Sequence, residues 1–482
     1  MLSMLKIRKL FFIVLCCSLF IAADAQKLYL SEKEDFNIRV DDFAVIGKYQ
    51  QSMVVYRKRN PNAEILFYTD KMVKEKSLPL DFLPEQYTNI RFVCNQQKLL
   101  VFYEIKESKK QHLYASQLLE NGSWQSPVLL NTKPIGFLKD YVPYKYSVSE
   151  NKQRILFYNA YYLSGNNTIQ AVIVDDELNI LKQINQFYSD KEYFFSDKSA
   201  ISNKGLPYLL ATDRPNNRGH VEELKILSLS DFSKDLLVFP SNLEKHFISD
   251  LQLAVDNKNG NIYIASFFSD GKYSNPRGIY FSIFDEEKQA TTTSHFVPIA
   301  LQISKSNADL KDIKMRHLFL KNDGGLELVG EKYYQNIRTI SSINPIVGNS
   351  FVSVPDNART VTEYYYDEIY IFSFKNEGSL SWSQTILKEQ LSTDDGGLFS
   401  SFTPLQHPLG NAFIFNDLSS KNTRLLACYV SSKGEMNMKE IQTNEQIDEW
   451  NLLPRSAMQI SKSELLIPCM MKNNVCFLKL TF

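Results

Sequence analysis

The residues best suited to recognition gather in two stretches of the last third of the chain. Glu331-Lys332-Tyr333-Tyr334 forms the first stretch, and Glu363-Tyr364-Tyr365-Tyr366-Asp367-Glu368 forms the second. A tyrosine has a rigid apolar face and a polar tip, so tyrosines beside carboxylates can stack on a sugar or anchor a protein partner. The alternative is that they pack between sheets, because strands favour aromatic residues. The candidate binding residues are Tyr333, Tyr334, Tyr364, Tyr365 and Tyr366.

Motifs of known catalytic centres are missing from the sequence. It has no G-x-S-x-G, no H-E-x-x-H and no P-loop. None of the six histidines pairs with another at helical or metal-motif spacing, so we expect surface or packing roles for them. They are His112, His220, His246, His295, His317 and His407. The sequence therefore predicts no catalytic residue, no metal site and no cofactor.

The N-terminus has the pattern of a secretory signal peptide. Lys6, Arg8 and Lys9 precede an apolar run, and Ala23-Asp24-Ala25 supplies the small residues that a signal peptidase reads. We expect cleavage after Ala25, which leaves residues 26–482 as an exported chain. A membrane anchor is the first alternative, but the apolar run is short for a bilayer. Lipidation at Cys16 or Cys17 is the second, although bulky residues precede both cysteines.

The exported chain carries almost no net charge. Residues 1–25 hold three basic residues and one acidic residue, so their removal takes the balanced chain to a net charge of about −2. Such a chain has no general attraction to nucleic acid or to an anionic membrane surface. No later stretch is long and apolar enough to span a membrane.

Four cysteines remain after cleavage: Cys94, Cys428, Cys469 and Cys476. An oxidising compartment permits disulfides, and Cys469 with Cys476 is the nearest pair. The two residues would lie on or beside neighbouring strands if a hairpin joins them. A disulfide and a pair of small buried strand residues are both open interpretations.

A turn followed at once by a short apolar run recurs along the chain. Gly and Asn in these turns supply the positive φ that tight hairpins need. The runs are apolar on both faces, as expected of strands that are covered on both sides. They begin near residues 53, 99, 155, 206, 262, 326, 412 and 465. A four-stranded propeller blade takes about 40–50 residues, so this spacing predicts an all-β protein with a β-propeller of seven to eight blades.

A second polar turn late in most units predicts the hairpin to the outer strand of each blade. The turns at 120–124, 175–178, 376–382 and 432–436 are examples. The final unit ends before such a turn, so it is one strand short. Residues 27–40 precede the first unit and could supply the missing strand, which would close the ring by pairing the two chain ends. The one long step between units predicts an insertion at about 335–362. A pair of β-sandwich domains would fit the strand content but not the single period.

Propellers can also host glycosidases, which defines the alternative function. Trp124 and Trp382 lie near Gly-containing turns, which faintly resembles the Asp-box of sialidases. Neither site matches the full motif, and sequence cannot show two carboxylates at a defined separation. A glycan-binding or glycan-hydrolysing propeller is therefore the alternative to a protein-binding one.

Residues 311–418 resemble a group of uncharacterised exported, β-propeller-like proteins of Bacteroidetes-type bacteria. The resemblance rests on Asp323-Gly324-Gly325-Leu326, Glu331-Lys332-Tyr333-Tyr334, Tyr365-Tyr366-Asp367-Glu368-Ile369 and Asp394-Asp395-Gly396. It implies a cell-envelope setting, in the periplasm or at the outer membrane, and no particular activity. We therefore expect a non-catalytic propeller that binds one or more envelope proteins.

Overall fold

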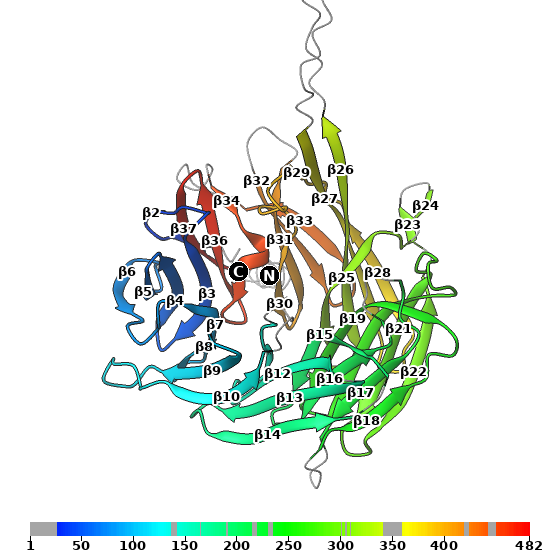
Figure 1. Cartoon of the computed structure of the whole chain (residues 1–482). Coiled ribbons are helices and arrows are strands. Elements are labelled where there is room, and N and C mark those ends of the chain that lie inside the picture. Colours follow the sequence, from blue (N-terminus) through cyan, green and yellow to red (C-terminus); the bar gives the residue numbers. More distant parts are fainter. Residues whose placement is uncertain are drawn as a thin grey trace, which may run out of the picture.

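The chain folds into four-stranded antiparallel sheets arranged like the blades of a propeller (Figure 1). The computed structural model describes residues 27–135, 142–163, 165–188, 191–214, 219–229, 235–299, 301–303, 306–308, 310–340, 359–418, 424–441 and 450–482. The signal peptide expected at residues 1–25 lies outside this part of the chain. The predicted all-β propeller of about eight blades is confirmed.

The first four blades follow one another along the chain. Blade 1 contains β3 (Asp42–Tyr49), β4 (Ser52–Arg59), β5 (Asn62–Tyr68) and β6 (Lys74–Pro79). Blade 2 contains β7 (Tyr87–Cys94), β8 (Leu99–Glu107), β9 (Lys110–Gln117) and β10 (Val128–Pro134). Blade 3 contains β11 (Lys145–Val148), β12 (Arg154–Leu163), β13 (Asn166–Asp175) and β14 (Ile180–Phe187). Blade 4 contains β15 (Phe194–Ile201), β16 (Pro207–Thr212), β17 (Leu224–Ser228) and β18 (Leu237–Ser241).

The remaining blades follow the same order, with small additions. Blade 5 contains β19 (Phe247–Asp256), β20 (Asn261–Ser269), β21 (Gly278–Asp285) and β22 (Ala290–Pro298). A two-stranded ribbon follows, made of β23 (Leu301–Ile303) and β24 (Ser306–Ala308). Blade 6 contains β25 (Ile313–Leu320), β26 (Leu326–Ile340), β27 (Arg359–Phe374), β28 (Leu380–Ile386) and the short β29 (Leu391–Thr393). Blade 7 contains β30 (Thr403–His407), β31 (Gly410–Asp417), β32 (Arg424–Ser431) and β33 (Met436–Glu440).

Blade 8 joins the two ends of the chain. It contains β34 (Asn451–Leu452), β36 (Glu464–Met471), β37 (Asn474–Thr481) and β1 (Lys27–Leu30), with β2 (Glu34–Asp35), β35 (Met458–Gln459) and a 3₁₀ turn, η2 (Pro454–Ser456). β1 pairs with β37 from Lys27 opposite Thr481 to Leu30 opposite Leu478, so the N-terminal segment supplies the missing strand as predicted. Blade 8 packs on blade 1 through Met53 and Phe477 and on blade 7 through Ile414 and Leu465.

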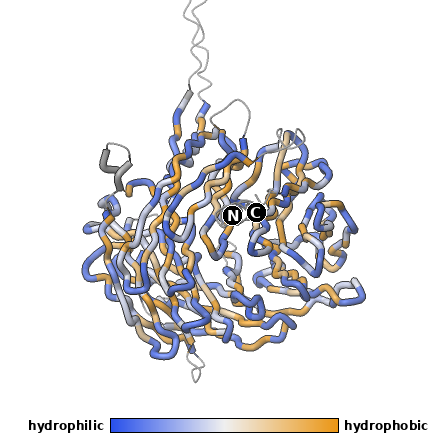
Figure 2. Tube along the Cα trace, turned by 180° about the vertical axis from the view of Figure 1, so that it is seen from behind, coloured by the Kyte–Doolittle hydropathy of each residue, from blue (hydrophilic) through white to orange (hydrophobic). Residues whose placement is uncertain are grey.

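The eight predicted apolar runs are the second strands of the eight blades. They are β4, β8, β12, β16, β20, β26, β31 and β36. The start of each of these strands is mostly buried because side chains on both faces meet a neighbouring blade. Leu156 and Leu209, for example, share one cluster between blades 3 and 4. Figure 2 shows the hydrophobic stretches running along the strands, with hydrophilic residues at many of the turns. Burial on two faces explains why these strands do not alternate.

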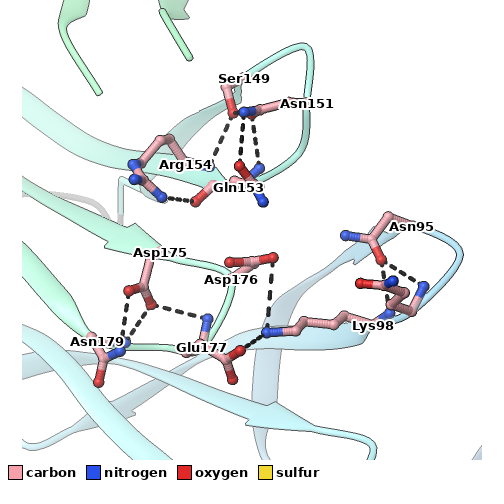
Figure 3. Close-up of polar contacts among 11 residues, drawn as sticks. Asn95, Lys98, Ser149, Asn151, Gln153, Arg154, Asp175, Asp176, Glu177 and Asn179 are labelled. Carbon is pink, nitrogen blue, oxygen red and sulfur yellow. Dashed lines mark hydrogen bonds and ion pairs between the residues drawn. The ribbon is translucent and has the colours of Figure 1, made fainter. Parts of the chain in front are cut away.

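Polar turns at one end of the strands link neighbouring blades (Figure 3). The Asn95 side chain accepts bonds from the backbone N–H groups of Gln97 and Lys98, which closes the β7–β8 turn. Lys98 then reaches the β13–β14 turn of blade 3, where its Nζ pairs with Asp176 and Glu177. The turn before the predicted run at residue 99 and the turn predicted at 175–178 therefore bend the chain and also join two blades.

The hairpin β26–β27 is longer than the others and rises above the ring (Figure 1). Its paired strands run through Gln335–Ile340 and Arg359–Thr362, which were expected to be part of an insertion. These segments continue the ladder because they are rich in β-branched residues such as Ile337, Thr360 and Val361. The rest of the expected insertion, 341–358, lies outside the described residues.

Candidate functional site

The five candidate tyrosines lie at the base of the long hairpin, in two cross-strand pairs and a single residue. Tyr333 lies opposite Tyr366, and Tyr334 lies opposite Tyr365. Because side chains alternate along a strand, the two pairs project from opposite faces of the hairpin. Tyr364 shares the face of the first pair and lies opposite Gln335. The structure therefore divides the predicted cluster between two surfaces.

The pair Tyr333–Tyr366 is part of the packing of the protein. The Tyr366 side chain is only 3% exposed, and its ring lies 5.4 Å from the Arg455 guanidinium and 5.8 Å from that of Arg316. Gly397 abuts the same ring, and a Cβ atom there would overlap it. The packing interpretation of the tyrosines therefore describes Tyr366, whose ring joins blade 6 to the link that enters blade 7 and to Arg455 of blade 8.

The pair Tyr334–Tyr365 forms a half-exposed row with Leu391 of β29. The two rings stack with centroids 4.5 Å apart at an interplanar angle of 10°. Tyr365 also lies opposite Leu391, whose side chain is 50% exposed. Residues directly opposite one another share a face, so Tyr334, Tyr365 and Leu391 form one continuous surface, here called the tyrosine row.

Carboxylates fix both hydroxyls of the tyrosine row. The Tyr365 hydroxyl donates to Glu363 over 3.1 Å, and the Tyr334 hydroxyl is hydrogen-bonded to Asp367. Burial, together with the negative charge of Asp367, raises the pKa of Tyr334 to about 12. Burial, together with the nearby Glu368, raises the pKa of Asp367. The tyrosines are thus held in one orientation and remain neutral at physiological pH.

A hollow of about 550 Å³ opens between blades 6 and 7 beside the tyrosine row. Its acidic lining residues are Asp367, Glu368, Glu389 and Asp417. Leu387, also in the lining, is 67% exposed. Lys332 lies 3.7 Å from Glu368, and Arg424 pairs with Asp417, so part of this negative charge is offset within the chain. We call this feature the acidic hollow.

A buried ion pair holds the base of the hairpin. Glu331 of β26 and Lys388, which follows β28, lie 2.9 Å apart with side chains 0% and 1% exposed. Glu331 also accepts from Arg316 and from the Ser401 hydroxyl, both at 2.9 Å. Lys388 donates to the backbone carbonyl of Tyr366 over 2.8 Å. Burial lowers the pKa of Lys388, and the charge of Glu331 opposes that shift.

Sequence reasoning missed a buried polar residue that recurs at the sixth or seventh position of the second strand. Seven blades carry such a buried side chain: Arg57, Glu104, Asn159, Thr212, Ser266, Glu331 and Asn416. Asn159, for example, donates to the carbonyl of Val142 over 3.0 Å, and Asn416 donates to that of Phe399 over 2.7 Å. In both cases the carbonyl lies in the link that enters the blade. The signal was present in five of the runs, which Arg57, Glu104, Asn159, Ser266 and Asn416 follow directly.

The predicted cysteine pair lies directly across a hairpin. Cys469 of β36 is the register partner of Cys476 of β37, as expected if a hairpin joins them. All four described cysteines are free and buried in the structure. Burial, together with the neighbouring Cys469, raises the pKa of the Cys476 thiol. The packing interpretation of these two residues describes the structure, and the disulfide stays a prediction.

The histidines and tryptophans have packing roles where their contacts are defined. His317 of β25 stacks on Phe319 with centroids 5.5 Å apart, and burial lowers its pKa to about 4. The Trp124 indole donates to the carbonyl of Pro79 and that of Trp382 to the carbonyl of Ser432, each in a neighbouring blade.

Within the described ranges, no group of three or more His, Cys, Asp or Glu side chains is arranged to hold a metal ion. The same ranges contain no helix long and apolar enough to cross a bilayer.

Comparison with known proteins identifies no family and carries no argument about activity. No protein-family model matches the chain, and no curated protein matches it. The chain is similar to prolyl oligopeptidase B from Galerina marginata, with 8% identity, a TM-score of 0.43 and coverage of 89% of this chain and 55% of that one. It is also similar to a polysaccharide lyase, ulvan lyase, with 10% identity, a TM-score of 0.38 and coverage of 80% and 90%.

A third similar structure also has low identity and a low TM-score. Apocarotenoid oxygenase from Synechocystis gives 9% identity, a TM-score of 0.34 and coverage of 72% of this chain and 74% of that one. At these identities and scores the similarities carry no argument about substrate or reaction. The fold and the site together are those of an all-β propeller whose long hairpin carries a stacked pair of half-buried tyrosines.

Proposed function

We propose that the protein is a non-catalytic β-propeller of the cell envelope that binds another protein through the tyrosine row and the acidic hollow. The observation that carries this proposal is the stacked pair Tyr334–Tyr365 beside Leu391, which is 50% exposed, with the 67% exposed Leu387 in the lining of the hollow. Rigid aromatic residues with an apolar surround are typical of the centre of protein interfaces.

The charge of the hollow indicates the chemistry of the partner. Asp367, Glu368, Glu389 and Asp417 would attract a basic side chain, and the adjacent row would cover its aliphatic stem. Arginine suits such a site because it combines a planar cation with apolar contact area. The partner is therefore a protein that presents a basic residue flanked by apolar ones.

The setting in the envelope rests on the sequence alone. The pattern of residues 1–25 supports export, and the resemblance over 311–418 supports the periplasm or the outer membrane. The glycan-active alternative is not carried forward. The two tryptophans that suggested it bond to neighbouring blades, and the similarity to ulvan lyase has a TM-score of only 0.38.

Affinity purification of the tagged exported chain from gently solubilised envelopes, followed by mass spectrometry, tests the proposal. We expect a discrete protein in fixed ratio to the wild-type chain, and its loss from the Tyr365→Ala variant. Tyr273→Ala is the matched control, because Tyr273 is an 80% exposed tyrosine in another blade. Recovery of no stoichiometric partner, or equal recovery with Tyr365→Ala, would contradict the proposal.

A further inference from the structure

The backbone N–H and C=O groups along the two outer edges of the long hairpin differ in how many hydrogen-bond partners they have. Along the outer edge of β27, the Tyr366 N–H donates to the carbonyl of Gln390 over 3.0 Å. Further along, the Asp394 N–H donates to the carbonyl of Thr362, and the Thr362 N–H donates to the Asp394 carboxylate, both over 2.9 Å. The β27 edge is therefore covered by β29 and the residues that flank it.

The outer edge of β26 loses its neighbour partway along. β25 pairs with β26 only as far as Ile313 opposite Lys332. The last bond on this side runs from the Tyr333 N–H to the carbonyl of Asp312, over 2.8 Å. Backbone groups of successive residues point to alternate sides of a strand. The N–H and C=O groups of Gln335, Ile337 and Thr339 therefore point away from β27, and no described residue bonds to them.

This open edge lacks the features that normally prevent strand pairing. Residues 335–339 are all exposed, and Ile337 is 67% exposed. The segment has no proline, glycine or lysine, and the charge of Arg338 is matched by Glu363 at 2.7 Å. An exposed, regular edge of this kind is a template for another strand. The edge belongs to the part of the hairpin that rises above the ring (Figure 1).

We propose that this edge pairs with the same edge of a second copy of the chain, antiparallel and centred on Ile337. Ile337 then lies opposite itself, Asn336 opposite Arg338, and Gln335 opposite Thr339. No like charges face one another, and the outward backbone groups of residues 335, 337 and 339 meet in hydrogen-bonded pairs. The two hairpins become one four-stranded sheet.

A second copy of the chain suits this edge better than a strand of another protein does. A two-fold pairing uses the same edge on both subunits, so it leaves neither edge open. The exported chain has a net charge of about −2, so two copies repel one another only weakly. The inference is independent of the proposed function, because it uses the edge of the hairpin and not the tyrosine row.

Sedimentation velocity of the purified exported chain over a range of about 1 to 100 μM tests the dimer. We expect the sedimentation coefficient to rise with concentration towards that of a dimer. Ile337→Pro removes one outward N–H on each copy and should raise the dissociation constant about tenfold or more. Proline at an outward-facing edge position spares the β26–β27 ladder, so circular dichroism should remain that of the wild type.

Two further variants keep the test decisive if the proline variant does not fold. Ile337→Lys places like charges opposite each other on the two-fold axis, so its dimer should weaken at low salt and recover at high salt. Ile337→Thr is the matched control, which keeps the backbone donor and the β-branched shape and should still dimerise. A chain that stays monomeric throughout overturns the proposal, and so does a dimer that Ile337→Pro and Ile337→Lys leave unchanged.

Discussion

At the residue scale, the side chains that define the site are held by neighbours that neutralise or bury them. Tyr334 and Tyr365 are oriented by Asp367 and Glu363, and Tyr366 is enclosed by two arginines. Each residue type was visible in the sequence. The sequence did not show which tyrosine would be buried, because the register of β26 against β27 decides which face of the hairpin each tyrosine occupies.

His317 should make the stability of the protein depend on pH. Burial, with the charges of Lys198 and Arg316, lowers its pKa to about 4, whereas the unfolded chain has a histidine pKa near 6.5. The unfolded state therefore binds more protons between these values, and the free energy of unfolding falls as pH drops from about 6.5 to about 4, by up to about 3 kcal/mol.

Urea unfolding of the wild type and of His317→Gln at pH 7 and pH 4.5 measures this contribution. The loss of stability on acidification should be about 2 kcal/mol smaller in His317→Gln, because the variant has no group to protonate at that position. Equal losses in the two proteins would show that His317 is not held neutral in the fold.

The buried cysteines should be unreactive until the protein unfolds. Burial raises the pKa of Cys94 to about 12 and that of Cys428 to about 11, so neither thiol forms much thiolate at pH 8. With Ellman's reagent we expect negligible reaction of the folded chain that begins at Gln26, and four thiols per chain in guanidinium. Two thiols in guanidinium would reveal the Cys469–Cys476 disulfide.

At the element scale, the long hairpin depends on a charge pair that lies beneath it. Glu331 comes from β26 and Lys388 from the segment between β28 and β29, and Lys388 also bonds to the backbone of Tyr366. The pair therefore fixes the base from which the tyrosine row projects. A buried pair of this kind contributes mainly through the cost of leaving one partner alone.

Lys388→Met should lower the free energy of unfolding by about 3–5 kcal/mol, because it leaves part of the Glu331 charge uncompensated in the interior. The double variant Glu331→Gln, Lys388→Met should lose less than the sum of the two single changes. Urea denaturation of all three variants gives the comparison. A cost below about 1 kcal/mol for Lys388→Met would mean that Arg316 and Ser401 satisfy Glu331 without it.

At the scale of the whole molecule, the two chain ends stabilise each other. β1 supplies the outer strand of blade 8, and the Phe477 N–H donates to the Ser31 hydroxyl over 2.9 Å. Leu28 and Leu30 pack against the cluster between blades 7 and 8. Without β1, the edge of β37 would face solvent next to apolar residues.

Deletion of residues 27–31 should lower the free energy of unfolding by about 3 kcal/mol or more and promote aggregation, because two leucines lose their packing and a strand edge opens. The matched control is the chain that begins at Gln26. Differential scanning calorimetry and light scattering measure the two effects. An unchanged melting temperature would show that β1 contributes little to blade 8.

The sequence by itself determined the repeating architecture of this protein. Turn residues and doubly apolar runs are local signals, and each run proved to be the second strand of a blade. The final unit lacked a strand and the first unit followed a spare segment, so the pairing of β1 with β37 could also be predicted. Local hydrogen bonding decides the turns and burial decides the strands. Both show in the residue types of a few neighbouring positions.

Only the tertiary structure decided the site. Glu331 and Lys388 lie far apart in sequence, and the five tyrosines are divided between two faces by the strand register. The outer edge of β26 is open because β25 does not extend past Lys332. The expected insertion at 335–362 likewise proved to continue two strands at its ends. These outcomes depend on which strands and links come into contact in the fold. A short segment of sequence does not determine which segment it will contact.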